Sequence, residues 1–337
     1  MRRGNGRGPR RLLTDGLLAL AERLAGRHRP PEPLEPSRVR KVLAVEAGGV
    51  GDLLRVLPAL EALRANFPAA ALSLLASPAG CQALGLFPRR EILDRVLAFD
   101  VRGPHRPLAA KLALIRALRR EGFDLAYAPL RGEGMRALTM LVYLTGAPHR
   151  IGFTCDGVGG LHTIRLPFRR ESPILQQNLA LLGAAGLAVP TDAIRIAVPP
   201  AARLAASRLL GGAGGGDGPL VSVHPGAAWR AAYRCWPLER FEALIRLLRS
   251  DLGASVLILG DRGEAPGLAA LCERIADPRV INTAGRTSLA EMAALVERSQ
   301  LFVGNDSGPL HIALALGVPS VGIFAATAAE QVLPAGH

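Results

Sequence analysis

The sequence is poor in aromatic residues, lysine and cysteine. Only 4% of its 337 residues are aromatic, and among 41 basic residues only Lys41 and Lys111 are lysines. The four cysteines are scattered and form no CxxC pair: Cys81, Cys155, Cys235 and Cys272. This spacing argues against a zinc knuckle and a disulfide framework, and isolated thiols fit a reducing compartment.

Long apolar runs are also missing. No stretch reaches the roughly 18 uninterrupted apolar residues of a membrane-spanning helix, so we expect none. The short apolar run Leu12–Leu24 contains Asp15, Glu22 and Arg23, and no clear small-residue cleavage site follows it. We therefore expect no secretory signal and a cytoplasmic location.

The charge is mainly of one sign, with a formal net charge of +13. Because the guanidinium group binds phosphate and carboxylate through two hydrogen bonds, an arginine-rich surface favours anionic partners. The net charge alone would also allow a nucleic-acid binder. The sequence contains no recognition motif and no basic groove with interleaved aromatic residues, so we expect no nucleic-acid partner.

Residues 1–40 form a basic, proline-rich extension. They contain ten arginines against four acidic residues, an amphipathic stretch over Leu12–Leu24 and a proline-rich run over Pro30–Pro36. The extension is either a solvated tail with one weak helix or a segment that lies peripherally on an anionic membrane, here the inner membrane. The sequence leaves both interpretations open.

Beyond Lys41, short apolar runs alternate with amphipathic helical patterns. The first half predicts strands over 42–45, 71–76, 96–99 and 124–128, with helices over 52–66, 107–121 and 134–145. The second predicts strands over 220–224, 256–260, 280–282, 301–304 and 320–324, with helices over 238–251, 264–276, 288–298 and 309–316. Such alternation predicts an α/β protein with two Rossmann-like parallel sheets.

The chain therefore divides into an N-terminal domain over 41–198, a glycine-rich linker over 199–219 and a C-terminal domain over 220–337. Six glycines between 211 and 218 suggest the linker. Two Rossmann-like halves facing a central cleft would hold a ligand between them.

Three strand-to-helix loops contain candidate site residues. In the first, Gly48, Gly49 and Gly51 allow a ligand to approach the backbone, and Asp52 follows them. The loop lacks the GxGxxG spacing and the later acidic residue of a nicotinamide site. Asp52 is either a helix cap or a general base at the edge of the cleft.

The second loop, HPGAAWR followed by RCWP, contains Arg230 and Arg234, which could bind phosphate or be simply solvated. The third loop, GNDSGPLH, opens an apolar helix. Asp306 or Ser307 can cap that helix, and the free amides beyond them can bind a phosphate. Taken alone, His311 is more typical of a helix histidine than of a catalyst.

In order and spacing, the motifs GGVGD, HPGAAW…WPLERF and AGRTSLAEM…FVGNDSGPLHIALALGVPSVGIF resemble glycosyltransferase family 9 over residues 41–327. These are bacterial heptosyltransferases of lipopolysaccharide inner-core assembly. The resemblance implies a GT-B fold and an inverting, metal-independent transfer without a cofactor. It also implies an ADP-heptose donor in the C-terminal half and an anionic glycolipid acceptor in the N-terminal half.

The resemblance also implies roles for individual residues. Asp52 matches the family's general base, and Arg234 stands where the family usually has a phosphate-binding lysine. Arg230, Ser307 and Gly308 would add to the diphosphate site. The remaining donor residues implied are Asp306, His311, Glu264, Thr287, Ser288 and Leu289, and the acceptor-side loop consists of Gly48, Gly49 and Gly51.

Two departures from the family pattern leave alternatives open. The usual Phe-Gly-Pro-Thr is replaced by Phe324-Ala325-Ala326-Thr327, and this sequence ends ten residues later. The alternatives are a transferase that uses another nucleotide sugar and acceptor, or a relative that binds sugar or lipid with impaired catalysis.

Overall fold

The computed structural model describes residues 33–131, 135–191, 193–211, 218–226, 235–325 and 328–333. Their contacts divide the chain into two compact units. Unit 1 holds the described residues of Met1–Ala47, Pro58–Pro78 and Glu91–Asp192, and unit 2 holds those of Gly48–Leu57, Ala79–Arg90 and Ala193–His337. Unit 2 therefore includes the first glycine loop, although that loop directly follows a strand of unit 1.

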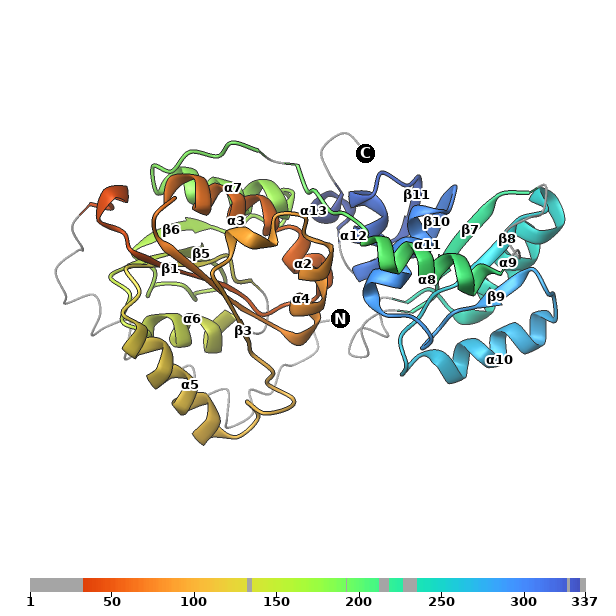
Figure 1. Ribbon diagram of the computed structural model, residues 1–337, viewed down its shortest axis with the longest axis horizontal. Helices are drawn as coiled ribbons and strands as arrows, with labels where there is room; N and C mark the ends of the chain where they lie inside the picture. The colour runs from red at the N-terminus through yellow and green to blue at the C-terminus, as the bar shows by residue number, and fades with distance from the viewer. Residues whose placement is uncertain are drawn as a thin grey trace. The chain divides into compact units, whose positions relative to one another are not determined.

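Unit 1 contains a six-stranded parallel sheet in the order β3-β2-β1-β4-β5-β6. Its strands are β1 (Lys41–Glu46), β2 (Ala71–Ala76), β3 (Arg95–Ala98), β4 (Leu125–Ala128), β5 (His149–Thr154) and β6 (Ile164–Pro167). Figure 1 shows α3 (Leu57–Asn66) and α7 (Ile174–Ala184) on one face of this sheet, and α5 (Leu108–Glu121) and α6 (Met135–Leu144) on the other. Helices on both faces explain why β1, β2 and β4 are buried almost throughout.

Unit 2 contains a five-stranded parallel sheet in the order β11-β10-β7-β8-β9. Its strands are β7 (Leu220–His224), β8 (Ser255–Ile258), β9 (Val280–Asn282), β10 (Leu301–Asn305) and β11 (Ser320–Ile323). Its helices are α2 (Val50–Leu54), α4 (Pro78–Ala83), α8 (Pro200–Leu210), α9 (Leu238–Leu252), α10 (Ala265–Ile275), α11 (Leu289–Glu297), α12 (Gly308–Ala315) and α13 (Ala329–Val332). Short 3₁₀ turns lie at Pro36–Arg38, Leu84–Leu86 and Arg90–Ile92.

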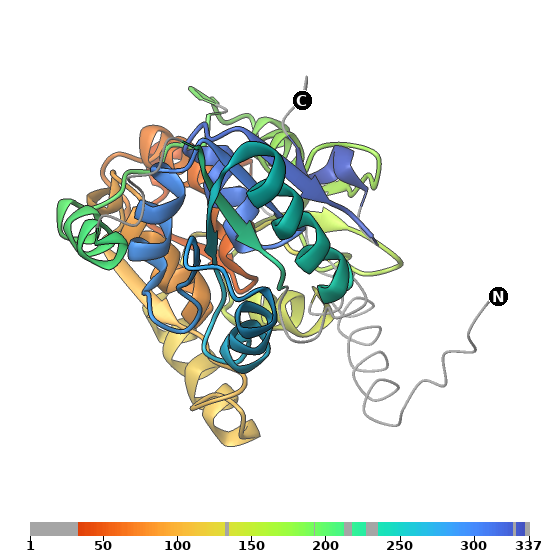
Figure 2. The same cartoon turned by 90° about the vertical axis from the view of Figure 1, so that its right-hand side faces the viewer.

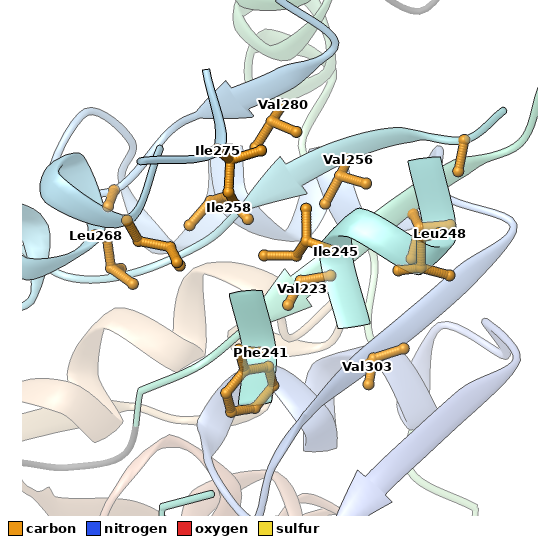
Figure 3. Packing of buried hydrophobic residues seen from close by; sticks show 14 residues of the cluster. Val223, Phe241, Ile245, Leu248, Val256, Ile258, Leu268, Ile275, Val280 and Val303 are labelled. Carbon is orange, nitrogen blue, oxygen red and sulfur yellow. The ribbon is translucent and has the colours of Figure 1, made fainter. Parts of the chain in front are cut away.

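The core of unit 2 lies between this sheet and helices α9 and α10. Phe241 and Ile245 of α9 are fully buried and face Val223 and Val256 of the sheet (Figure 3). In Figure 2 the long helix α9 runs in front of the sheet. This packing fixes β7 and β8 as a rigid base for the loops that follow them.

The predicted strands are confirmed, each within two residues at either end, but other elements differ from prediction. Strands β5 and β6 and helix α7 were not predicted, and the helix expected over 52–66 is divided into α2 and α3. Pro58 explains the division, because proline has no backbone N–H to donate to the carbonyl of Leu54 and is tolerated only in the first turn of a helix.

The expected linker over 199–219 is not irregular throughout. Its first half is helix α8, which is started by Pro200 and buries Ala202, Ala206 and Leu210 at helical spacing. Helix α8 packs against α11 of unit 2. Residues 212–217, which contain most of the expected glycines, lie outside the described residues.

No helix among the described residues is long and apolar enough to cross a membrane. No disulfide joins the four cysteines. Burial raises the pKa of each thiol, so none is activated as a nucleophile.

Candidate active site

Polar side chains from three strand ends of unit 2 meet around His224, the last residue of β7. Its Nδ1 lies 3.1 Å from the Ser307 hydroxyl oxygen, and its Nε2 lies 3.6 Å from Oε2 of Glu264. The histidine is only 6% exposed, so these neighbours fix its ring. Because parallel strands end at one edge of the sheet, His224 links two predicted donor residues that lie far apart in the sequence.

Glu264 is held as a carboxylate. Burial acts to raise the pKa of Glu264, but the contact and charge of His224, together with the Asp261 amide, outweigh it and keep the pKa below its ordinary value. The Asp261 N–H donates to Oε2 over 2.8 Å. A Cβ at Gly226 would lie 1.8 Å from Oε1, so any larger residue at this position of the loop after β7 would displace the carboxylate.

Ser307 is the N-cap residue of helix α12, but its side chain makes no hydrogen bond to the amides of the first turn. Ser307 has extended backbone at the N-cap position, but its hydroxyl contacts His224 and makes no capping hydrogen bond. The positive end of the helix dipole and the first-turn amides, including that of Gly308, lie at this point. Such a helix start can bind a phosphate group.

Asn305, fully buried at the end of β10, ties together the two ends of the loop that contains the predicted arginines. Its Oδ1 accepts from the Trp236 N–H at 3.0 Å, and its Nδ2 donates to the carbonyl of Pro225 at 2.6 Å. Arg230 and Arg234 lie outside the described residues, but the ends of their segment are fixed next to Ser307. Sequence analysis missed Asn305, although a polar residue that ends an apolar strand was the available signal.

Asp52 caps helix α2 and pairs with an arginine. Its Oδ2 accepts from the Gly49 N–H at 2.9 Å, and its Oδ1 accepts from Nη2 of Arg55 at 2.8 Å. Gly48 lies against the same carboxylate, because a Cβ there would be 2.4 Å from Oδ2. The N-cap of α2 is Gly49, and Asp52 is the third residue of the helix, so it caps by accepting the Gly49 N–H and is not itself the N-cap. The role of base stays a prediction.

Arg55 connects this aspartate to helix α12 inside unit 2. The residue is 7% exposed, and its Nη1 lies 3.5 Å from Nε2 of His311. Nε2 of His311 lies 3.9 Å from Oδ1 of Asp306. A Cβ at Gly51 would lie 2.0 Å from His311 Cδ2, so α2 and α12 are in close contact. Sequence analysis also missed Arg55, whose signal was its place one helical turn after Asp52.

Among the other predicted donor residues, Ser288 has a structural role. Ser288 is the N-cap of α11: its hydroxyl accepts from the Glu291 N–H, and its own N–H donates to Oε2 of Glu291 over 2.7 Å. Nucleotide contacts at Thr287, Ser288 and Leu289 stay predictions.

Within the part of the chain that the structure describes, no three His, Cys, Asp or Glu side chains lie close enough to hold a metal ion.

Two parallel α/β units, one of them with polar side chains at the carboxyl ends of its strands, have the GT-B fold. Solved structures share this fold: a family 9 glycosyltransferase from Veillonella parvula (TM-score 0.68, 20% identity, 87% of this chain and 82% of that chain) and the ADP-heptose lipopolysaccharide heptosyltransferase II of E. coli (TM-score 0.67, 21% identity, 88% of both chains).

Comparison of the sequence with known proteins identifies the family. The model of glycosyltransferase family 9 (heptosyltransferase) matches residues 111–337. Lipopolysaccharide heptosyltransferase 3 of Escherichia coli is 28% identical over 292 residues, which cover 82% of this chain and 81% of the relative. Lipopolysaccharide heptosyltransferase 2 of E. coli K12 is 26% identical over 314 residues, which cover 88% and 86%. The chain belongs to glycosyltransferase family 9 and is a glycosyltransferase.

Proposed function

We propose that this enzyme transfers heptose from ADP-heptose to an anionic acceptor of the lipopolysaccharide-core type, on the cytoplasmic face of the inner membrane. The names of its relatives support the donor and acceptor classes. The observation that carries the proposal is the contact inside unit 2 between α2, which contains Asp52, and α12, which begins the predicted diphosphate site.

In the proposed reaction, the Asp52 carboxylate accepts the proton of the acceptor hydroxyl. The acceptor oxygen forms a bond to the anomeric carbon of the donor, and the bond from that carbon to the diphosphate oxygen breaks on the opposite face. ADP leaves with the bonding electrons, and the configuration at the anomeric carbon inverts. Arg55 keeps the carboxylate oriented through its 2.8 Å ion pair.

The departing diphosphate needs positive charge, because its negative charge grows in the transition state. We assign this charge to Arg234 and Arg230, with help from the amides at Ser307 and Gly308. Glu264 would bind the ribose hydroxyls, and Asp306 and His311 would face the donor sugar. With guanidinium groups and a helix N-terminus available, the proposed reaction uses no metal or cofactor.

Donor-dependent ADP release with a purified lipid acceptor tests this function. A panel of nucleotide sugars should give turnover with ADP-heptose, and excess EDTA at matched ionic strength should leave the initial rate unchanged. Turnover with a different nucleotide sugar, and none with ADP-heptose, would show that the donor is not ADP-heptose. ADP-heptose binding without any turnover would leave the chain a binding relative, and a rate that collapses on chelation and returns with magnesium would overturn the metal-free mechanism.

Asp52→Asn tests the proposed base. Asparagine can still accept the Gly49 N–H, so folding and donor affinity should persist while kcat falls by about 10²–10⁴-fold. Asp277→Asn is a matched control, because Asp277 also pairs with an arginine, Arg249, at 2.7 Å and accepts a backbone N–H. Lower thermal stability with unchanged specific activity in Asp52→Asn would reduce Asp52 to a helix cap.

A further inference from the structure

Apolar side chains are exposed in one short segment of unit 1. Among the described residues, eight large hydrophobic side chains are exposed, and three of them fall between positions 101 and 112: Val101 at 49%, Leu108 at 70% and Leu112 at 39%. The last two lie on helix α5, which buries only Leu118. Exposed large apolar side chains gathered in one segment suggest an interaction site.

The basic residues of α5 lie beside this apolar stripe. Leu108 and Leu112 are one helical turn apart, and Arg116 and Arg119 continue the same side of the helix toward its end. Lys111 flanks the stripe on the other edge, and Arg120 follows Arg119. None of these four basic residues makes an ion pair with any residue that the structure describes.

Acidic charge is nearly missing from this helix. Its single acidic residue, Glu121, is the last residue, where it pairs with Arg95 at 2.7 Å. Basic side chains near a helix C-terminus are favourable for the helix dipole, which accounts for Arg119 and Arg120. The dipole does not account for Lys111 in the first turn, nor for exposed leucines.

We propose that α5 and the turn before it form a membrane-docking surface for an anionic lipid bilayer. Leu108 and Leu112 would enter the boundary between headgroups and acyl chains, and Lys111, Arg116 and Arg119 would bind lipid phosphates. Figure 1 shows α5 beside α6 on the outer side of unit 1, where its full length of about 21 Å could lie along a surface. The inference rests on the proposed function, since it names the surface by which the enzyme reaches a lipid-linked acceptor.

Co-sedimentation of the full chain with lipid vesicles tests this surface. We expect binding to vesicles of phosphatidylcholine with phosphatidylglycerol and little binding to phosphatidylcholine alone. The double variant Leu108→Ser/Leu112→Ser should weaken the partition coefficient about tenfold or more. Lys111→Gln and Arg116→Gln should each weaken it roughly fivefold at low salt.

The double variant Leu247→Ser/Leu252→Ser is a matched control. These leucines of α9 are 56% and 54% exposed, and the control should bind vesicles like the unmodified chain. Unchanged vesicle binding by the α5 variants overturns the proposal. Full loss of vesicle binding on deletion of residues 1–32 alone, with α5 intact, also overturns it. If only an acidic protein bound α5 and vesicles did not, the lipid surface would also be excluded.

A donor assay separates this inference from the proposed function. ADP-heptose binding and turnover with a detergent-free, water-soluble acceptor should be equal in the α5 variants and the unmodified chain. Turnover with acceptor embedded in anionic vesicles should fall in step with vesicle binding. If no heptose transfer occurs under any condition, the proposed function fails, while vesicle binding still reports on α5.

Discussion

At the scale of single residues, His224 connects two predicted site residues. Its ring joins Ser307 to Glu264, so it positions both without being proposed to react. In the sequence, His224 is the first residue of the HPGAAWR motif, and nothing there predicts its contacts. Its partners come from loops 40 and 83 residues away, and no local pattern encodes such a contact.

His224→Ala should weaken ADP binding about fivefold or more, because Ser307 loses a hydrogen-bonding neighbour worth about 1 kcal/mol and Glu264 loses a contact that orients it. At saturating donor, kcat should stay within about twofold of the unmodified value, because His224 contacts no reacting atom in the proposed reaction and its loss would weaken binding of the ground state and the transition state equally. Calorimetry with ADP and a separation of KM from kcat measure this. His224→Asn, whose amide can still reach Ser307, should restore part of the affinity.

Ser222→Ala is the control for loss of a buried polar group in the same strand. The Ser222 hydroxyl contacts that of Ser299 at 2.7 Å, and we propose no ligand contact for either residue. This variant should lose some stability and keep its ADP affinity. Equal ADP losses in the His224 and Ser222 variants would mean that His224 acts only through packing.

His162 in unit 1 should make stability depend on pH. The side chain is 3% exposed, and neither ring nitrogen has a hydrogen-bond partner among the described residues. Burial, with the charges of Arg150 and Arg165, lowers the pKa of His162 to about 4. Between this value and the ordinary 6.5, the unfolded chain binds more protons, so stability is complete above pH 6.5 and falls as the pH drops toward 4.

At pH 5 the resulting loss is about 2 kcal/mol relative to neutral pH. His162→Leu removes the titrating group, so its free energy of unfolding should change less between pH 7.5 and pH 5 than that of the unmodified chain. Denaturant titrations of both proteins at the two pH values check this. An equal loss in both proteins would show that His162 does not titrate in this range.

At the scale of elements, glycine allows α2 to approach α12. Gly51→Ala would place a methyl group 2.0 Å from the His311 ring, so α2 must shift and carry Asp52 with it. We expect a loss of about 1–3 kcal/mol in stability, typical of overpacking, together with reduced turnover. Thermal unfolding and initial rates measure both.

Gly267→Ala in α10 is the matched control. Both glycines lie in helices of unit 2, but nothing lies within 4 Å of a Cβ at Gly267. Alanine there should stabilise the protein by up to about 1 kcal/mol and leave turnover unchanged. If both variants behave alike, the contact between α2 and α12 does not constrain the site.

Some helices and strands could be predicted from the sequence and others could not. The strands of unit 2 were predictable because each is a short buried apolar run between turn signals, as in β7 and β10. Strand β6 was not, because it spans only four residues and ends in Pro167, and proline counts against a strand. Helix α8 was hidden because its small residues and the glycines after it resemble a linker. The contacts that stabilise it with α11, among them the 2.7 Å ion pair of Arg203 with Glu297, are not visible in the local sequence.

At the scale of the whole molecule, the division into units separates the proposed donor site from the sheet of unit 1. The residues that would bind ADP, and the segment Gly48–Leu57 with Asp52, all belong to unit 2. This assignment was not available from the sequence, in which the first glycine loop lies within the N-terminal half. A ligand that binds one unit stabilises that unit by mass action.

ADP should therefore protect unit 2 selectively from amide hydrogen exchange. At about 100 times its dissociation constant, a ligand that binds only the folded state stabilises it by about 2.7 kcal/mol. Exchange at β7, β10 and residues 48–57 should slow accordingly, while β4 and β5 of unit 1 should exchange at their ligand-free rates. Adenosine, which lacks the diphosphate, should protect much less, because the α12 start and the arginine-bearing loop would have no anion to bind. Equal protection of both units would show that they open as one cooperative structure, and protection confined to unit 1 would exclude a donor site built around His224 and Ser307.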